Sequence, residues 1–167
     1  MFVMMFKFLG GAQEVGRSAI VLSEQQNILL DYGIKLNHKI EYPISVPNVD
    51  AFILSHAHLD HSGHAPALYN EMLVPAFGTE PTLKLSELLL NDSLNIAKRE
   101  HMSQKFHKRQ IASFMHRYTS IDYHSPFSIG NFDIEFFDAA HISGSAITLI
   151  ERRKAKENKR IVYTGDF

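Results

Sequence analysis

The stretch His56-Ala57-His58-Leu59-Asp60-His61 decides how this sequence is interpreted. It comes directly after Ala51–Leu54, a short apolar run that is typical of a buried strand. Side chains two residues apart on an extended segment point the same way, so the first two histidines can bind one metal ion. The aspartate and the last histidine follow where the chain bends, and they can bind a second ion nearby. Zinc uses imidazole and carboxylate ligands, and the stretch therefore predicts a zinc site rather than an exposed, histidine-rich loop.

A histidine and an aspartate further along the chain extend this prediction. His141 follows the alternating strand Phe132–Phe136, and the small residues around it allow the backbone to approach a crowded metal centre. The metal held by the first two histidines needs a third protein nitrogen, which favours a ligand here over a structural histidine. Asp166 follows the strand Ile161–Tyr163, where a carboxylate can bridge two metal ions. An ordinary loop aspartate is the alternative interpretation of Asp166.

Asp31 closes another apolar strand, in the stretch Leu29-Leu30-Asp31-Tyr32-Gly33. We interpret it as a residue that orients a histidine or the metal loop through hydrogen bonds, rather than as a ligand. The alternative is an ordinary turn residue before Gly33.

The composition limits the classes of protein that this sequence can represent. A length of 167 residues predicts one domain, and the 45% of hydrophobic residues is enough for a substantial core. There are no cysteines, which excludes disulfides and thiolate zinc sites and makes the cytoplasm the expected location. No run approaches the length of a membrane span, and the apolar start reads as a strand rather than a signal peptide. The net charge of −1 gives no global attraction to nucleic acid, so any RNA affinity must come from a local patch or from other parts of a longer protein.

Hydrophobic patterning predicts strands near both ends of the chain and helices between them. The order predicts an α+β arrangement, a sheet with helices on one face. The predicted strands are Val3–Leu9, Ser18–Leu22, Ile28–Leu30, Ala51–Leu54, Val74–Phe77, Phe132–Phe136, Ala146–Ile150 and Ile161–Tyr163.

Three helices are predicted in the middle of the chain. One begins just after His61. A second is capped by Thr79, and Leu85, Leu88 and Leu89 form its core-facing stripe. The third is capped by Ser103, and its core-facing stripe is Ile111, Phe114, Met115 and Tyr118.

In order along the chain, these motifs resemble the first four motifs of the metallo-β-lactamase superfamily. The opening stretch, Gly10-Gly11-Ala12-Gln13-Glu14-Val15-Gly16-Arg17-Ser18, is similar to that of its β-CASP nucleases. Within that group it resembles in particular the archaeal and eukaryotic RNA 3′-end-processing factors of the cleavage and polyadenylation type. The resemblance covers essentially the whole chain. It implies a four-layer αβ/βα sandwich, of which residues 1–167 supply the N-terminal sheet and its helices. The β-CASP domain and the C-terminal half of the sandwich would lie outside this stretch.

The resemblance also implies a role for each site residue and a reaction. His56, His58 and His141 would hold one zinc ion. Asp60 and His61 would hold the other, with Asp166 bridging the two ions. The second site would lack one histidine that the family supplies later in its sequence. Asp60 and Asp166 would orient an attacking hydroxide in the hydrolysis of RNA phosphodiester bonds, whether as an exonuclease or as an endonuclease. The chain by itself would have no substantial nuclease activity.

Two other functions stay open at this point. The zinc motif alone fits a thioesterase or a lactonase on the same fold, although the Gly10–Ser18 opening argues against these. A non-catalytic chain that associates with a partner is the other alternative. The inner faces of Ile28–Leu30, Ala51–Leu54 and Phe132–Phe136 would lack a covering sheet. We therefore expect self-association, or binding of the missing half as a separate chain.

Two weaker features are interpreted as solvent-exposed. A basic turn is expected to be a solvated hairpin tip; it contains Arg152, Arg153, Lys154, Lys156, Lys159 and Arg160. The remaining histidines match no motif and are expected on the surface or on helix faces; they are His38, His64, His101, His107, His116 and His124.

Overall fold

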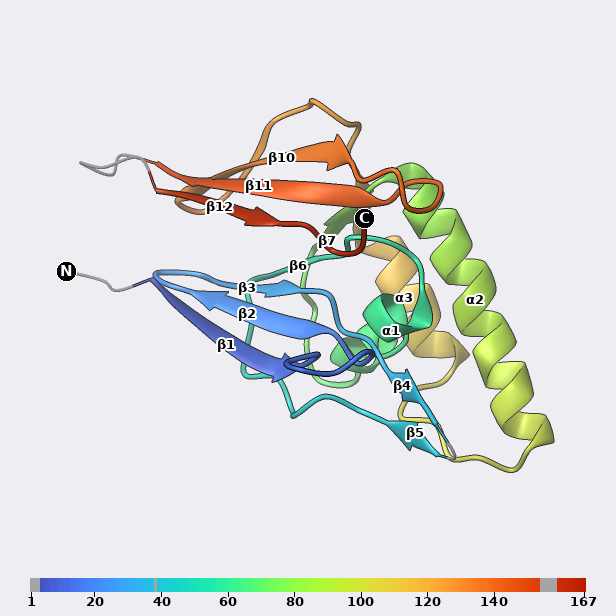
Figure 1. Ribbon diagram of the computed structural model, residues 1–167. Coiled ribbons are helices and arrows are strands. Elements are labelled where there is room, and N and C mark those ends of the chain that lie inside the picture. The colour runs from blue at the N-terminus through green and yellow to red at the C-terminus, as the bar shows by residue number, and fades with distance from the viewer. Residues whose placement is uncertain (1–3, 38, 154–158) are drawn as a thin grey trace.

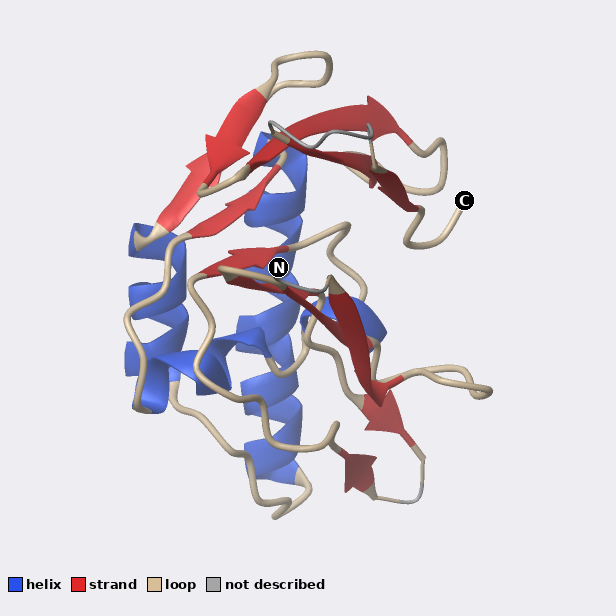
Figure 2. Cartoon of the chain, turned by 90° about the vertical axis from the view of Figure 1, so that its left-hand side faces the viewer, coloured by secondary structure: helices blue, strands red, loops and turns tan. Residues whose placement is uncertain are grey.

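A computed structural model describes residues 4–37, 39–153 and 159–167. Two sheets are stacked face to face, and the helices cover the outer face of the larger sheet (Figure 1). Turned by 90°, the same layers appear as two sheets above one another with helices on the far side of the lower one (Figure 2).

The larger sheet has six strands in the order β1-β2-β3-β6-β7-β8. The first three pair antiparallel, whereas β3, β6, β7 and β8 run parallel to one another. Parallel strands end at the same edge of a sheet, so the loops that follow β3, β6 and β7 lie side by side. The strands are β1 (Met5–Gly10), β2 (Ala19–Ser23), β3 (Asn27–Leu30), β6 (Ala51–Ile53), β7 (Ala76–Gly78) and β8 (Tyr118–Ser120).

The second sheet is antiparallel and has four strands in the order β12-β11-β10-β9. A short separate ribbon pairs β4 with β5. The strands of this sheet and the ribbon are β9 (Phe127–Ile129), β10 (Phe132–Asp138), β11 (Ala146–Arg152), β12 (Arg160–Tyr163), β4 (Lys35–Leu36) and β5 (Ile40–Glu41).

Alternating side chains divide the core into two layers. On β3, Leu29 packs among the helices, whereas its neighbours Ile28 and Leu30 face the second sheet. Across that interface they meet side chains of the second sheet such as Phe132 and Phe136, which are fully buried. Both faces of the central strands are therefore covered.

The predicted fold class is confirmed, but the expectation that the chain supplies only one sheet is wrong. Phe132–Phe136 lies in β10 of the second sheet, and its apolar face covers that of Ile28–Leu30 and Ala51–Leu54. The expected large uncovered face on these three segments is therefore absent. The cause is that the alternating pattern shows which face of a strand is buried, but not which sheet the strand joins.

Side-chain capping marks the start of α2 (Glu80–Arg99), whereas α1 (Leu59–Ser62) has no side-chain cap. Helix α1 begins before His61 rather than after it, and the 3-10 helix η1 (Ala65–Asn70) follows. In α2, Thr79 is the N-cap as predicted, since its side chain accepts a hydrogen bond from the Thr82 amide. No helix of the described residues is long and apolar enough to cross a membrane.

Two details of the predicted helices are wrong. Leu88 is 65% exposed, because the buried face of α2 is formed by Thr82, Ser86, Leu90 and Ala97. The third helix, α3 (Lys108–His116), is capped by His107 and Gln110 rather than by Ser103. Its buried residues include Ile111 and Phe114 as predicted, but Tyr118 already belongs to β8.

Of the residues predicted to be exposed, one contradicts the expectation. His64 is only 8% exposed, whereas His101, His107, His116 and His124 are exposed. The imidazole of His64 lies between the rings of Tyr32 and Tyr42, with centroids 4.6 and 4.5 Å away. His38 lies outside the described residues, as do Lys154 and Lys156 of the basic turn. Of the other basic residues of the turn, Arg153, Lys159 and Arg160 are exposed.

Candidate metal centre

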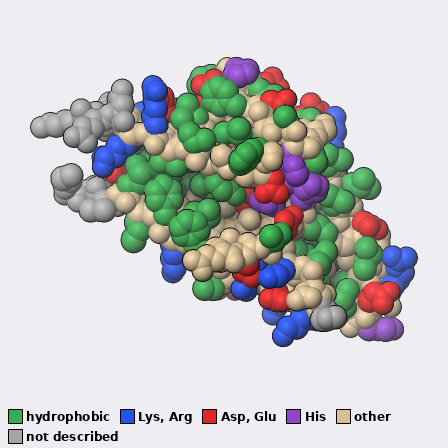
Figure 3. Space-filling model, viewed as in Figure 1, with side chains coloured by type: hydrophobic (Ala, Val, Ile, Leu, Met, Phe, Trp, Pro, Cys, Tyr) green, Lys and Arg blue, Asp and Glu red, His purple; other side chains and the backbone are tan. Residues whose placement is uncertain are grey.

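The predicted metal residues meet where the two sheets open toward solvent. The parallel strands β3 and β6 bring Asp31 and the His56–His61 loop to one edge of the larger sheet. The turn after β10 brings His141, and the end of β12 brings Asp166 from the second sheet. In the space-filling view, histidines gather beside acidic side chains at this place, near the middle of the face (Figure 3).

One group of ligand atoms comes from His56, His58, His141 and Asp166. Nδ1 of His58 lies 3.2 Å from Nε2 of His56 and 3.2 Å from Nε2 of His141. Four ligands placed tetrahedrally at the usual Zn–N distance are separated by about 3.3 Å. The imidazoles therefore already have the spacing of a zinc site, and the donor set fits this metal.

A second group comes from Asp60, His61 and Asp166. Nε2 of His61 lies 3.8 Å from Oδ2 of Asp60 and 3.3 Å from Oδ1 of Asp166. The other carboxylate oxygen of Asp166, Oδ2, faces the first group, at 4.0 Å from His56 and 3.8 Å from His141. Each oxygen of one carboxylate is thus directed to a different group, which is the arrangement a bridging ligand requires.

Asp31 lies beneath both groups and is fully buried. Its Oδ1 accepts the backbone N–H of Ser55, at 2.7 Å. Its Oδ2 accepts the hydroxyls of Ser55 and Tyr163 and contacts Nδ1 of His61, at 2.7, 2.6 and 2.6 Å. A charge in the interior is stable only with such partners. Asp31 therefore fixes the His61 ring so that Nε2 points to the second group.

Ser55 links Asp31 to the first group. Its hydroxyl has a single hydrogen, which it donates to Asp31, so its oxygen can only accept from Nδ1 of His56, 3.0 Å away. This leaves Nε2 of His56 as the unprotonated nitrogen that faces His58. Burial, with the nearby charge of His61, lowers the pKa of His56 to about 4, so this ring is neutral at neutral pH, as a metal ligand must be.

His61 differs from His56 in its charge. Burial opposes its protonation, but the surrounding carboxylates, Asp31 first, outweigh burial and raise its pKa to about 9. Burial likewise acts to raise the pKa of Asp31, yet the charge and hydrogen bond of His61 lower it overall. The carboxylates around His61 therefore favour a positive charge on or beside its ring. A metal ion would supply that charge in place of the proton on Nε2.

Sequence reasoning missed three residues that shape the site. Ser55 follows the predicted strand Ala51–Leu54 and Tyr163 ends the predicted strand Ile161–Tyr163, but neither residue was given a role at the site. Gly165 has φ +55°, and a side chain there would meet Oγ of Ser55 at 2.8 Å. Glycine is thus required for Asp166 to approach the His56 loop.

Comparison with known proteins gives matches to a family, to individual proteins and to solved structures. Residues 11–167 match the family described as Anti-Pycsar protein Apyc1. A protein of Methanocaldococcus jannaschii named "Probable RNase MJ4" is 40% identical over 164 residues, with 95% of this chain and 38% of that protein covered. The "Transcription termination factor FttA" of Methanothermobacter thermautotrophicus is 35% identical over 171 residues, with 95% and 27% covered. The chain therefore spans well under half the length of these relatives.

Solved structures agree with the fold. The subclass B3 metallo-β-lactamase MEM-A1, from a soil metagenome library, has a TM-score of 0.59 at 14% identity, covering 95% of this chain and 59% of that chain. Together with the archaeal relatives, this confirms the resemblance to the metallo-β-lactamase superfamily and its β-CASP nucleases. With a family match that spans residues 11–167, the chain belongs to the Apyc1 family and has the metallo-β-lactamase fold.

Proposed function

We propose that this chain is the metal-binding part of a zinc-dependent ribonuclease. The observation that carries the proposal is Asp166, whose two carboxylate oxygens face two separate groups of ligand atoms. Further support comes from the relatives, since one is named as an RNase and is 40% identical to this chain. We extend the proposal to a cytoplasmic location, where RNA is available to such an enzyme.

In this proposal each side chain has a defined task. His56, His58 and His141 would bind one zinc ion, and Asp60 and His61 would bind the other. Two zinc ions, when bound, lower the pKa of a shared water and stabilise the charge that develops on the phosphate oxygens. Asp31 and Ser55 hold the imidazole rings in the orientation that binding needs.

Two carboxylates are placed to act on the reacting water. The side chains of Asp60 and Asp166 are 33% and 46% exposed, in contrast to the buried Asp31. Substrate can therefore reach them from solvent. We assign them the orientation of the attacking hydroxide, because a carboxylate accepts its hydrogen bond and directs the lone pair toward phosphorus.

The proposal treats residues 1–167 as the N-terminal part of a larger catalytic unit. The first zinc site has its full set of protein nitrogens, whereas the second has one histidine and two carboxylates. Zinc titration of the purified chain should therefore give one tighter and one weaker site. Two equally tight sites would contradict this assignment.

A test of the reaction uses a longer protein that contains this chain. His58→Ala or Asp60→Ala should abolish RNA cleavage with little loss of stability, because both side chains are partly exposed and serve the metals rather than the core. His116→Ala, on the exposed face of α3, is the matched control and should cleave normally. Cleavage by either site variant at the unmodified rate rules the mechanism out.

The same proteins distinguish the alternatives. A thioesterase or lactonase would hydrolyse thioester or lactone substrates in a His58-dependent way and leave RNA intact. A non-catalytic chain would bind zinc and hydrolyse none of these substrates in any assembly.

A further inference from the structure

A cluster of positive charge lies at the C-terminal end of α2, remote from the metal centre. We call it the basic corner and define it as Lys98, Arg99, Lys105, Lys108 and Arg109. All five side chains are exposed. Between residues 98 and 109 the only acidic residue is Glu100, although the whole chain has a net charge of −1. The basic corner therefore creates a local positive potential, which the net charge of the whole chain does not.

The cations of the basic corner have no acidic partners in the part of the chain that the structure describes. The ion pairs of lysine and arginine found there lie elsewhere, and they involve Arg17, Lys35, Lys84, Arg152, Arg153 and Arg160. Lys108 and Arg109 occupy the first turn of α3, which contains no acidic residue. Positive charge is unfavourable at that end of a helix dipole. The chain's own described groups leave this repulsion uncompensated, and an external anion would relieve it.

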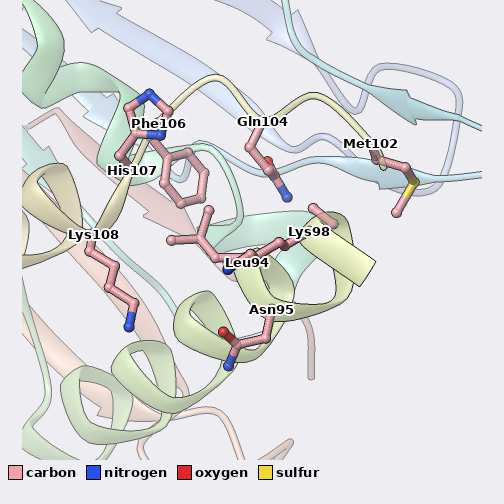
Figure 4. A pocket seen from close by; sticks show the side chains of 9 residues that line it. Leu94, Asn95, Lys98, Met102, Gln104, Phe106, His107 and Lys108 are labelled. Carbon is pink, nitrogen blue, oxygen red and sulfur yellow. The ribbon is translucent and has the colours of Figure 1, made fainter. Parts of the chain in front are cut away.

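Two residues of the basic corner, Lys98 and Lys108, line a cavity of about 500 Å³. Lys98 and Asn95 approach it from α2, Gln104 from the segment that leads into α3, and Lys108 from the first turn of α3 (Figure 4). Apolar groups complete its lining, and these include Leu94 and the buried Phe106. Cations at the mouth, amides on the walls and an apolar floor suit a ligand that combines phosphate with a planar, hydrogen-bonding group.

We propose that the basic corner binds the phosphates of single-stranded RNA and that the cavity accepts one of its bases. The identity of the ligand rests on the proposed function. Unstacked bases and a continuous line of phosphates are available in single strands but not in duplexes. The other end of α2 carries Thr79, which donates to the Gly144 carbonyl of the His141 loop. A helix of 20 residues is about 30 Å long, so an RNA that follows α2 connects the two sites over several nucleotides.

The test measures binding of a fluorescent, unstructured oligouridylate to the chain, with a chelator present so that metal and cleavage play no part. The variant Lys98→Gln/Lys108→Gln/Arg109→Gln removes three exposed cations. We expect its affinity at low salt to fall about tenfold or more, and the slope of log K against log salt to decrease by about 2, at about 0.7 per phosphate contact. The matched control, Lys7→Gln/Arg153→Gln/Arg160→Gln, changes the net charge equally and should keep both values near those of the unmodified chain.

Each other outcome has a defined meaning. Equal weakening in both triple variants, or no measurable binding of the oligouridylate, overturns the inference. Tighter binding to polyglutamate or to phosphatidylglycerol vesicles than to RNA also overturns it, since the partner would then be an acidic protein or a membrane. If the basic corner binds RNA as described but the longer protein cleaves none, the proposed function fails and the binding site stands. If the longer protein cleaves RNA but the triple variant binds the oligouridylate as tightly as the unmodified chain, the proposed binding site fails and the proposed function stands.

Discussion

At the scale of single residues, one buried carboxylate organises the candidate metal centre. Asp31 accepts hydrogen bonds from Ser55 and His61, which follow β6, and from Tyr163, which ends β12 far along the sequence. Asp31→Asn keeps the shape but replaces an acceptor oxygen with a donor that faces other donors. We expect a loss of about 10- to 100-fold in zinc affinity. Competition with a zinc-binding dye measures it, and Asp92→Asn, on the surface of α2, is the control that should change nothing.

His64 gives a second residue-scale prediction, on acid stability. Burial, with a contribution from Lys105, lowers the pKa of His64 from 6.5 to about 4, and its Nδ1 is buried without a hydrogen-bond partner among the described residues. As the pH falls, His64 is therefore protonated in the unfolded chain at a higher pH than in the folded chain. The contribution of the neutral His64 side chain to the free energy of unfolding is fully present above pH 6.5. It is lost as the pH falls toward 4, and the loss is about 3 kcal/mol.

The variant His64→Phe fills the same space without a titrating group. Urea unfolding at pH 7 and at pH 4.5 should show a smaller loss of stability in the variant than in the unmodified chain. An equal loss in both proteins would mean that His64 is not protonated on unfolding.

At the scale of secondary-structure elements, the N-terminus of α2 supports the metal centre. The Thr79 hydroxyl donates to the Gly144 carbonyl at 2.6 Å and also caps the helix. Thr79→Ala should lower the free energy of unfolding by about 1 kcal/mol. It should also weaken zinc binding at the three-histidine group, because the Gly144 carbonyl of the His141 loop keeps only one of its two hydroxyl donors, that of Thr82. Thr79→Ser retains the hydroxyl and should restore both properties. Weakened zinc binding in the serine variant as well would assign the effect to the lost methyl group.

Sequence patterns predicted the elements better than their assembly. Ala51–Leu54 and Phe132–Phe136 were recognised as strands, because strict alternation or a short apolar run is a local property. The first ends in β6 of one sheet and the second in β10 of the other, which depends on long-range pairing. The start of α3 was misplaced because His107, an unusual N-cap, replaces the expected Ser103. At the site, the histidines were identifiable by spacing, whereas the partners of Asp31 depend on tertiary contacts.

At the scale of the whole molecule, one apolar surface remains at the edge of the sandwich. The second sheet ends at β12, and Phe6 and Phe8 on the edge strand β1 are 43% and 57% exposed. Exposed aromatic side chains on an edge strand favour association. We expect the chain to self-associate with increasing concentration in sedimentation velocity. Phe6→Ser/Phe8→Ser should shift it toward the monomer, whereas Leu88→Ser, an exposed residue on α2, should not. A concentration-independent monomer before any substitution would contradict the prediction.

The division of the ligands between two sheets has a mechanical consequence. Asp60 and His61 are attached to the larger sheet, while His141 and Asp166 are attached to the smaller one. The ion of the first group would act as a crosslink across the sandwich, closing a chain loop that runs from His58 to His141. Its binding energy would add to the cohesion of the two layers. Sliding of one layer over the other would in turn separate the ligands, so that packing between Ile28 and Phe132, remote from the chemistry, would set how tightly the ion is held.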